Sequence, residues 1–252
     1  MAHKTSVEMV KELSIAVYQF YQFDKSRYKK KWSPLHITVE RDLLGLSQRV
    51  MNRLDEMDPK SSDGVIPLHF AASNGNLELF KLLFAGTKKK NQRDVVGITP
   101  YYSAAMKGHF EICAAIIMYL RNKNPASDIG NTPLHAAARH GHLEICSLLI
   151  DNVDDKNPTG VDGLTPLHIA ATHGLLNVVD TMIQRLEEKN PLCDSGETPL
   201  HFAALNGHFL TSKLIIENIT DKNPVCHNGA TPLHFAAMEG HAKVTKLLMK
   251  NV

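Results

Sequence analysis

The sequence predicts an all-helical repeat solenoid, and three periodic features predict it. A Thr-Pro-Leu-His motif or a near relative begins every 33 residues, at Ser33, Ile66, Thr99, Thr132, Thr165, Thr198 and Thr231. Two sets of glycines keep the same period, one running from Gly64 to Gly229 and the other from Gly75 to Gly240. All 12 prolines fit as well, because seven belong to the motif and the other five each lie eight residues before a motif proline. A period of this length is the signature of stacked units that bury their apolar faces against each other.

Each unit predicts a helix, a turn, a second helix and a hairpin-like loop. Threonine suits the position before a helix, because its hydroxyl accepts from an early helical N–H, and proline suits the first helical position. The mid-unit glycine, such as Gly141, ends the first helix with a positive φ. The segment HLEICSLLI at 142–150 then has apolar residues at helical spacing, and DKNPTGVDG at 155–163 has turn-forming residues.

A 33-residue unit with TPLH, a double alanine and Gly-His resembles the ankyrin repeat. Six good units run from about Ser62 to the C-terminus, and we number them one to six from the motifs at Ile66, Thr99, Thr132, Thr165, Thr198 and Thr231. A degenerate unit, SPLHITVERDLLGLSQRVMNRL, precedes them with Asp42 in place of the glycine. Residues 5–23 read as an amphipathic helix with a capping-box pattern at Thr5 and Glu8. We therefore expect an N-terminal capping helix and degenerate repeat at 1–61 and six ankyrin repeats at 62–252, forming one continuous solenoid.

The segment HAAARHGHLEIC at 135–146 is rich in metal-ligand residue types, but the repeat explains most of them. Ten of the 14 histidines occupy either the TPLH position or the position after the mid-unit glycine. The resemblance implies that these histidines make structural hydrogen bonds within and between units. His140 and His173 fall outside the motif, at equivalent positions of neighbouring units. Stacked helices lie about 8–10 Å apart, too far for two imidazoles to share one zinc ion without distortion. We therefore expect no metal and no cofactor.

The four cysteines also follow the period, as the pairs Cys113 with Cys146 and Cys193 with Cys226. Equivalent positions in stacked units are farther apart than the Cα separation of a disulfide, so we expect free thiols in a reducing compartment. The N-terminal segment carries Glu8, Lys11 and Glu12 where a signal peptide needs an apolar stretch. We expect an intracellular protein, most simply cytoplasmic, with the nucleus as the alternative.

Composition excludes some functions. The formal net charge is +2 and aromatic residues make up 6% of the chain, which is not typical of a nucleic-acid-binding protein. The sequence contains no run of 18 apolar residues, so it predicts no membrane-spanning helix. The basic runs at 25–31 and 87–93 fit solvated loops better than a nuclear import signal. Unit two has Tyr101 and Tyr102 in place of Leu-His, and the sequence does not decide between a packing change and a functional one.

The leading functional hypothesis is a non-catalytic protein–protein interaction module, because the resemblance implies protein binding and no catalytic motif lies outside the repeat. One alternative is an enzyme that uses His140, His173 and Cys226. Another is a regulatory or substrate-recruiting array of a larger protein, such as a ubiquitin ligase adaptor, a kinase or phosphatase regulatory subunit, or an ion channel.

The candidate partner-binding residues lie at the loop tips and at the ends of the first helices, which line the concave face in ankyrin-like units. On the loops they are Val95, Val96, Ile98, Ile129, Asn131, Val161 and Leu164. At the helix ends they are Met106, Lys107, Arg139, His140, Thr172 and His173. Apolar tips beside a basic strip favour an amphipathic partner with acidic residues, bound by a monomer across units two to four. The alternative is that some tips pack against each other along the loops.

Overall fold

The computed structural model describes residues 31–54 and 57–251. In this part of the chain, 14 α-helices form seven pairs and no strand occurs. The first helices of the pairs are α3 (Pro34–Glu40), α5 (Pro67–Asn74), α7 (Pro100–Lys107), α9 (Pro133–His140), α11 (Pro166–Thr172), α13 (Pro199–Leu205) and α15 (Pro232–Met238). The second helices are α4 (Leu44–Met51), α6 (Leu77–Gly86), α8 (Phe110–Ile117), α10 (Leu143–Asn152), α12 (Leu176–Arg185), α14 (Phe209–Asn218) and α16 (Ala242–Met249).

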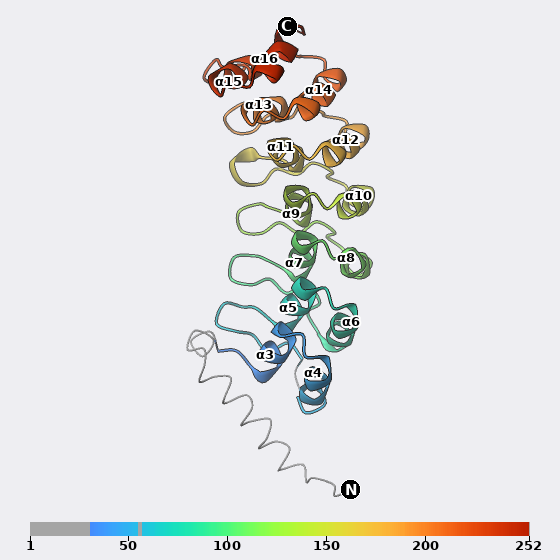
Figure 1. Cartoon of the computed structure of the whole chain (residues 1–252). Coiled ribbons are helices and arrows are strands. Elements are labelled where there is room, and N and C mark those ends of the chain that lie inside the picture. The colour runs from blue at the N-terminus through green and yellow to red at the C-terminus, as the bar shows by residue number, and fades with distance from the viewer. Residues whose placement is uncertain (1–30, 55–56, 252) are drawn as a thin grey trace, which may run out of the picture.

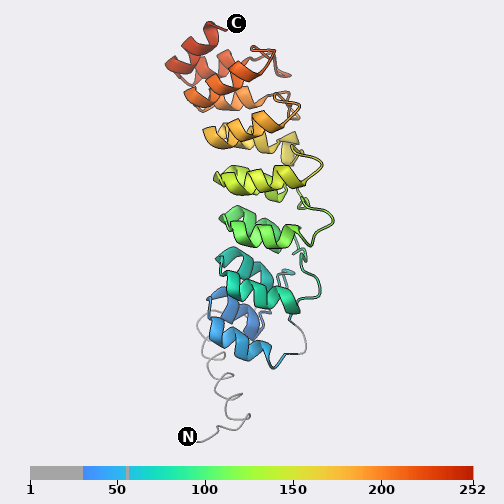
Figure 2. The ribbon, with the colours of Figure 1, turned by 90° about the vertical axis from the view of Figure 1, so that its right-hand side faces the viewer.

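The pairs stack in chain order into one column (Figures 1 and 2). Figure 1 shows the loops before α7, α9, α11 and α13 projecting from one side of the column, and α6, α8, α10, α12 and α14 along the other side. Each helix packs against its own partner, the first helices from α3 to α15 pack against one another in order, and so do the second helices from α6 to α16. The predicted fold class is thus confirmed. The helix predicted at 5–23 lies outside the described residues, so the division at 61 stays a prediction.

The repeated residues form the helix ends as the sequence predicts. Proline occupies the first turn of all seven first helices. In unit two the Thr99 hydroxyl accepts from the Tyr102 N–H at 3.1 Å. The mid-unit glycines have positive φ, for example 82° at Gly75. Asp42 takes the same left-handed conformation, with φ 57°, which aspartate tolerates better than most residues.

The core is a continuous column of small and branched apolar side chains. In units one to four the residue at the motif leucine position, the double alanine and two pairs of positions on the second helix are buried, as Leu134, Ala137, Ile145 and Leu149 illustrate in unit three. The alanines let the first helices approach closely, while the longer side chains fill the space between helices of a pair. Burial of these stripes requires neighbouring units, so the stack is the folding unit.

The motif histidines link each unit to the next. In unit three the His135 Nδ1 accepts from the Thr132 N–H at 3.1 Å, and its Nε2 lies 3.1 Å from the Leu164 carbonyl oxygen. Because a backbone N–H already fills Nδ1, the proton is on Nε2, which donates to the carbonyl. Five motif histidines make this inter-unit bond, namely His36, His69, His135, His168 and His201.

A second set of histidines links each unit to the one before it. The His142 Nε2 lies 3.1 Å from the Met106 carbonyl oxygen, and His109, His208 and His241 make the equivalent bond. Each of these rings lies over the glycine of the preceding unit. A Cβ added at Gly108 would be 2.6 Å from the His142 ring, so this glycine is needed for space as well as for its φ of 85°.

The boundary between units three and four lacks two of the three polar links. Leu175 replaces the second histidine, so no ring at this position bonds to the unit-three backbone. At the loop tips, the N–H of one tip donates to the carbonyl of the tip before it, as from Asp128 to Val96 at 3.1 Å and from Asp194 to Asp162 at 3.0 Å. No equivalent bond from Val161 occurs among the described residues. Of these three links only the bond from His135 to Leu164 remains. The Arg185–Asp151 ion pair, at 3.3 Å, also joins α12 to α10 across this boundary, but an exposed pair of this kind contributes little.

The unit-four tip is also turned differently from the others. Its residues Val161–Gly163 form a short 3-10 turn, η1, in which Asp162 has φ 56°. Gly160 stands where unit two has Asp94, whose carboxylate accepts from two backbone N–H groups of its tip. A side chain at 160 would meet the Asn131 side-chain oxygen at 2.2 Å. The glycine therefore makes room for Asn131 and leaves the tip without a side chain to fix its shape.

Because the motif histidines are buried, we expect the free energy of unfolding to fall in mild acid. Burial lowers the pKa of His135 and of His168 from 6.5 to about 4. Between these values the unfolded chain binds more protons, so this stability is complete above pH 6.5 and is lost as the pH falls towards 4. Each histidine should remove on the order of 1–2 kcal/mol of unfolding free energy between pH 7.5 and 5. Urea titrations at both pH values measure it.

The double variant His135→Gln with His168→Gln should flatten this pH dependence even if it is less stable at pH 7.5. The matched control is His234→Gln, because His234 is exposed and has no following unit to bond to among the described residues. An unchanged slope in the double variant, or an equal change in the control, would show that other groups cause the acid sensitivity.

The boundary between units three and four should open before the others. In a solenoid, stability is a sum of unit and interface contributions, so the interface with the fewest links separates first. We expect native-state hydrogen exchange in a urea series to show units one to three and units four to six as separate opening blocks. Leu175→His should add a bond to the Arg139 carbonyl and stabilise the boundary by about 1 kcal/mol, whereas His142→Leu should weaken the boundary before it. Equal protection on both sides in the wild type contradicts this assignment.

Candidate functional site

The loop tips of units two to four are exposed and apolar. Val95, Val96 and Ile129 are 63%, 55% and 60% exposed, and Val161 is 39% exposed. The backbone bonds from Val95 to Asp63 and from Asp128 to Val96 join successive tips into a continuous edge. The tips of units two and three therefore stand side by side but do not cover each other's side chains.

Three other predicted loop residues lie beneath the tips. Asn131 is only 8% exposed, so its side chain is not presented on the surface, contrary to the expectation from the sequence. Ile98 and Leu164 are half-buried, and their carbonyl oxygens accept from the His69 and His135 rings. These three residues support the tips, and a bound partner would not rest on Asn131.

The ends of the first helices form a positively charged strip. Lys107, Arg139, His140 and His173 are exposed, and α7 and α9 end at two of them. Burial lowers the pKa of His140, and the positive charges of Arg139 and Lys107 and the nearby imidazoles lower it further. An acidic group bound here would reverse the second effect. We name Lys107, Arg139, His140 and His173 the basic strip.

Met106 and Thr172 lie half-buried beside the basic strip. Their carbonyl oxygens accept from His142 and His208 of the following units. The bonds from His142 and His208 thus fix the backbone of Met106 and Thr172, the residues beside the basic strip.

The structure gives the metal alternative no further support. The His140 ring stacks on His142 with centroids 6.0 Å apart, and the His173 Nδ1 bonds the Ile169 carbonyl oxygen of its own helix at 2.9 Å. No group of three metal-ligand side chains occurs within residues 31–54 and 57–251. The absence of a metal stays a prediction.

The substituted pair in unit two divides between the core and the surface. Tyr101 takes the place of the motif leucine and is fully buried. Tyr102 is half-buried, and burial raises the pKa of its hydroxyl. In the described residues no bond from that hydroxyl replaces the histidine link to Asn131, so the boundary between units two and three relies on His142 and the loop tips.

The sequence reading missed two acidic residues among the apolar tips. Asp128 pairs with Arg93 at 2.5 Å between the loops of units two and three, and the Asp162 side chain is exposed at the tip of unit four. Asp128 directly precedes Ile129 and Asp162 directly follows Val161, so the sequence already places a carboxylate beside each of these two apolar tips. The Asp128–Arg93 pair ties two tips together, while Asp162 adds a negative charge where unit four begins.

The four cysteines are free, as the sequence predicts, and all four are buried. Burial raises the pKa of the Cys113 and Cys146 thiols to about 12, which makes them poor nucleophiles at neutral pH. Cys226 is 3% exposed, and its thiol donates to the Asn228 side chain at 2.9 Å. A Cys226–histidine pair therefore has no support in this geometry.

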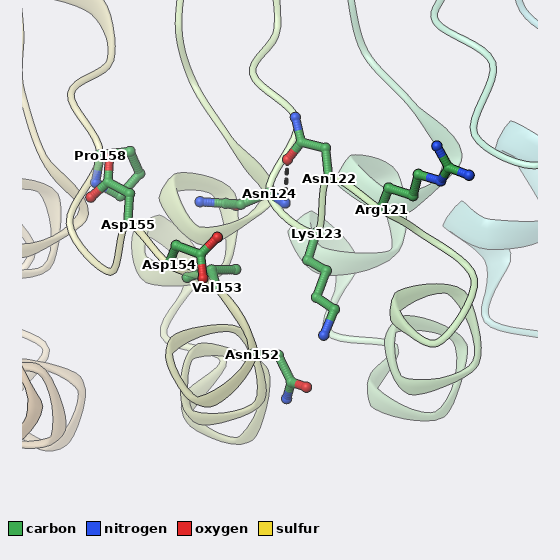
Figure 3. A pocket seen from close by; sticks show the side chains of 9 residues that line it. All are labelled: Arg121, Asn122, Lys123, Asn124, Asn152, Val153, Asp154, Asp155 and Pro158. Atoms are coloured by element: carbon green, nitrogen blue, oxygen red, sulfur yellow. Dashed lines mark hydrogen bonds between the residues drawn. The ribbon is translucent and has the colours of Figure 1, made fainter.

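A hollow of about 670 Å³ opens between the loops that follow α8 and α10 (Figure 3). Its charged side chains include Arg121 and Lys123 from the first loop and Asp154 and Asp155 from the second. Several lining residues hold turns: Asn122 accepts from the Asn124 N–H at 3.0 Å, and Asp155 accepts from the Asn157 N–H at 3.1 Å. The hollow is thus a product of loop structure and offers no nucleophile–base pair.

Stacked helix pairs with an open row of loop tips and helix ends define a repeat solenoid built to present a surface. None of the described helices is long and apolar enough to cross a bilayer. A family model described as "Ankyrin repeats (3 copies)" matches residues 41–126, 68–162, 102–191 and 181–252. The chain belongs to the ankyrin repeat family. No curated protein matches it in a sequence comparison. Ankyrin repeats are generally protein–protein interaction modules and are typically non-catalytic.

The buried thiols give a direct test. Intact mass under non-reducing, denaturing conditions should equal that of the fully reduced chain, because the cysteines are unpaired. Alkylation of Cys113 and Cys146 in the native protein should be slow and should become fast in urea, since only unfolding exposes them. A mass lower by about two units per bridge, or rapid native alkylation, would contradict this.

Proposed function

We propose that the chain binds a partner protein through the tips of units two to four and the basic strip. The observation that carries the proposal is the row of four exposed apolar tips, Val95, Val96, Ile129 and Val161. Exposed apolar side chains that gather on one surface often mark an interaction site. Here they gather on neighbouring loops, and the unit-two loop is bonded to the tips before and after it.

The basic strip indicates the chemistry of the partner. Lys107 and Arg139 are cationic side chains. Burial and the neighbouring positive groups lower the pKa of His140, so an anion bound beside it favours the charged imidazole. A partner segment with apolar residues for the tips and Asp or Glu for the strip fits both features. Charge complementarity of this kind mainly speeds association and selects the partner, while the apolar contacts supply affinity.

The proposal fits a protein that functions inside the cell, as a monomer and without direct contact to nucleic acid. Four unpaired cysteines are typical of a reducing compartment. An ankyrin array of this kind can also recruit substrates or regulators for a larger protein, and that second candidate uses the same surface. Affinity capture from cell extract followed by mass spectrometry identifies the partner, and a longer natural chain would favour the second candidate.

Two substitutions test the proposed surface. Val96→Asp places a charge among the apolar tips, and Arg139→Glu reverses a charge of the basic strip. Each should weaken binding of the captured partner by about 1–3 kcal/mol, with little change in Tm because both side chains are exposed. Calorimetry with the purified pair measures this.

The matched controls are Val225→Asp and Lys246→Glu. Val225 is 61% exposed on the loop before unit six, and Lys246 is exposed on α16. Both should leave binding unchanged. Full binding by Val96→Asp and Arg139→Glu, with loss in a control or on substitution of Glu239, would move the site to the C-terminal units.

A further inference from the structure

A second feature of the same side of the solenoid has the opposite charge. A groove of about 490 Å³ lies between the loops of units four and five and α13, and it includes Phe202, Leu164 and the carboxylates of Asp162, Asp194 and Glu197. We name it the acidic groove. Neither the proposed function nor the stacking of units requires it.

The floor of the acidic groove is aromatic. Phe202 packs edge-to-face against the His168 ring, with centroids 5.6 Å apart and planes at 89°, and remains half-buried. At the equivalent position, units three and four have the buried residues Ala136 and Ile169, whereas Phe70 of unit one packs against Trp32 with centroids 4.9 Å apart. Unit five therefore places a half-buried aromatic ring in the groove, where units three and four have buried aliphatic side chains.

The scaffold holds the three carboxylates around this floor. The Asp194 N–H donates to the Asp162 carbonyl oxygen at 3.0 Å, which brings the two exposed tips together. A Cβ at Gly163 would be 2.3 Å from an Asp194 carboxylate oxygen, so the glycine makes room for that carboxylate. Glu197 accepts from the Ser195 hydroxyl and from the Cys193 thiol.

Within the described residues, none of these three carboxylates forms an ion pair with a lysine, arginine or histidine. A groove with charges of one sign concentrates counter-ions of the other sign. A lysine or arginine side chain satisfies the whole site, since its alkyl part covers Leu164 and its charge lies near the carboxylates and the Phe202 ring.

We propose that the acidic groove receives a lysine or arginine side chain of the partner. The inference rests on the proposed function, and it adds the direction in which the partner segment runs along the solenoid. The partner segment then runs with its acidic part on the basic strip of units two to four and its basic residue in units four and five.

The experiment uses a probe that does not depend on the identity of the partner. The whole chain, labelled with ¹⁵N, is titrated with the acetylated and amidated peptide Gly-Gly-Arg-Gly-Gly, and with Gly-Gly-Glu-Gly-Gly as the matched anion. Saturable shifts are expected for amides of residues 160–164 and 193–203 with the arginine peptide alone. The loop and helix start at 226–235 are the internal control, because Phe235 also packs on a histidine there but the tips are His227 and Asn228.

The double variant Asp194→Asn with Glu197→Gln should weaken binding of the arginine peptide roughly fivefold or more, while Glu239→Gln should not change it. Equal shifts with both peptides, shifts spread over the control loop, or unchanged affinity in the double variant would overturn the proposal. Val96→Asp and Arg139→Glu should leave the arginine titration unchanged. Failure of the proposed function alone is thus distinguishable, since it would leave this titration intact.

Discussion

The structure depends on the neutral motif histidine, such as His135, which forms hydrogen bonds in its own unit and in the next unit at once. Its Nδ1 accepts from the backbone that begins its own helix, and its Nε2 donates to a carbonyl 29 residues further along. His135 is 1% exposed, and an unpaired donor or acceptor buried in this way would cost about 1–3 kcal/mol. Protonation would put a second donor where Nδ1 now accepts. The same ring therefore fixes the start of a helix, the loop of the next unit and the protonation state that keeps the stack stable.

The second set of histidines couples two positions in neighbouring units, the histidine itself and the mid-unit glycine of the preceding unit. The ring of one unit occupies the space that a side chain at the preceding glycine would fill, so glycine and histidine are coupled across the boundary. At Leu175 the coupling changes character. The leucine lies over Gly141, with the nearest atom 3.2 Å from an added Cβ, and the link becomes apolar. We expect this substitution, together with the glycine at 160, to make this boundary open more easily than its neighbours without a change in the helices themselves.

Most of the fold could be predicted from the sequence, because its determinants are local and repeat. Threonine, proline and glycine fix helix ends within a unit, and the period fixes which helices meet. The candidate site was less predictable, because exposure depends on which way each loop residue turns. Asn131 was expected at the surface, but Gly160 of the next unit leaves a space that its side chain fills. The acidic groove needs residues of two units and one helix to converge, and no single stretch of sequence shows that. The roles of the Asp and Asn residues before the loop prolines were similarly hidden, since they hold turns through backbone bonds and form few ion pairs.

A stack of identical units would offer a partner the same surroundings every 33 residues, and a bound segment could then slide by whole units. The variable positions remove this degeneracy. Apolar tips occur in units two to four, positive charge occurs at the ends of α7 and α9, and carboxylates gather from Asp162 to Glu197. A misplaced segment would bring like charges together, which costs affinity and so selects one register. The periodic residues thus build the scaffold, and recognition rests on the positions at which the period is broken.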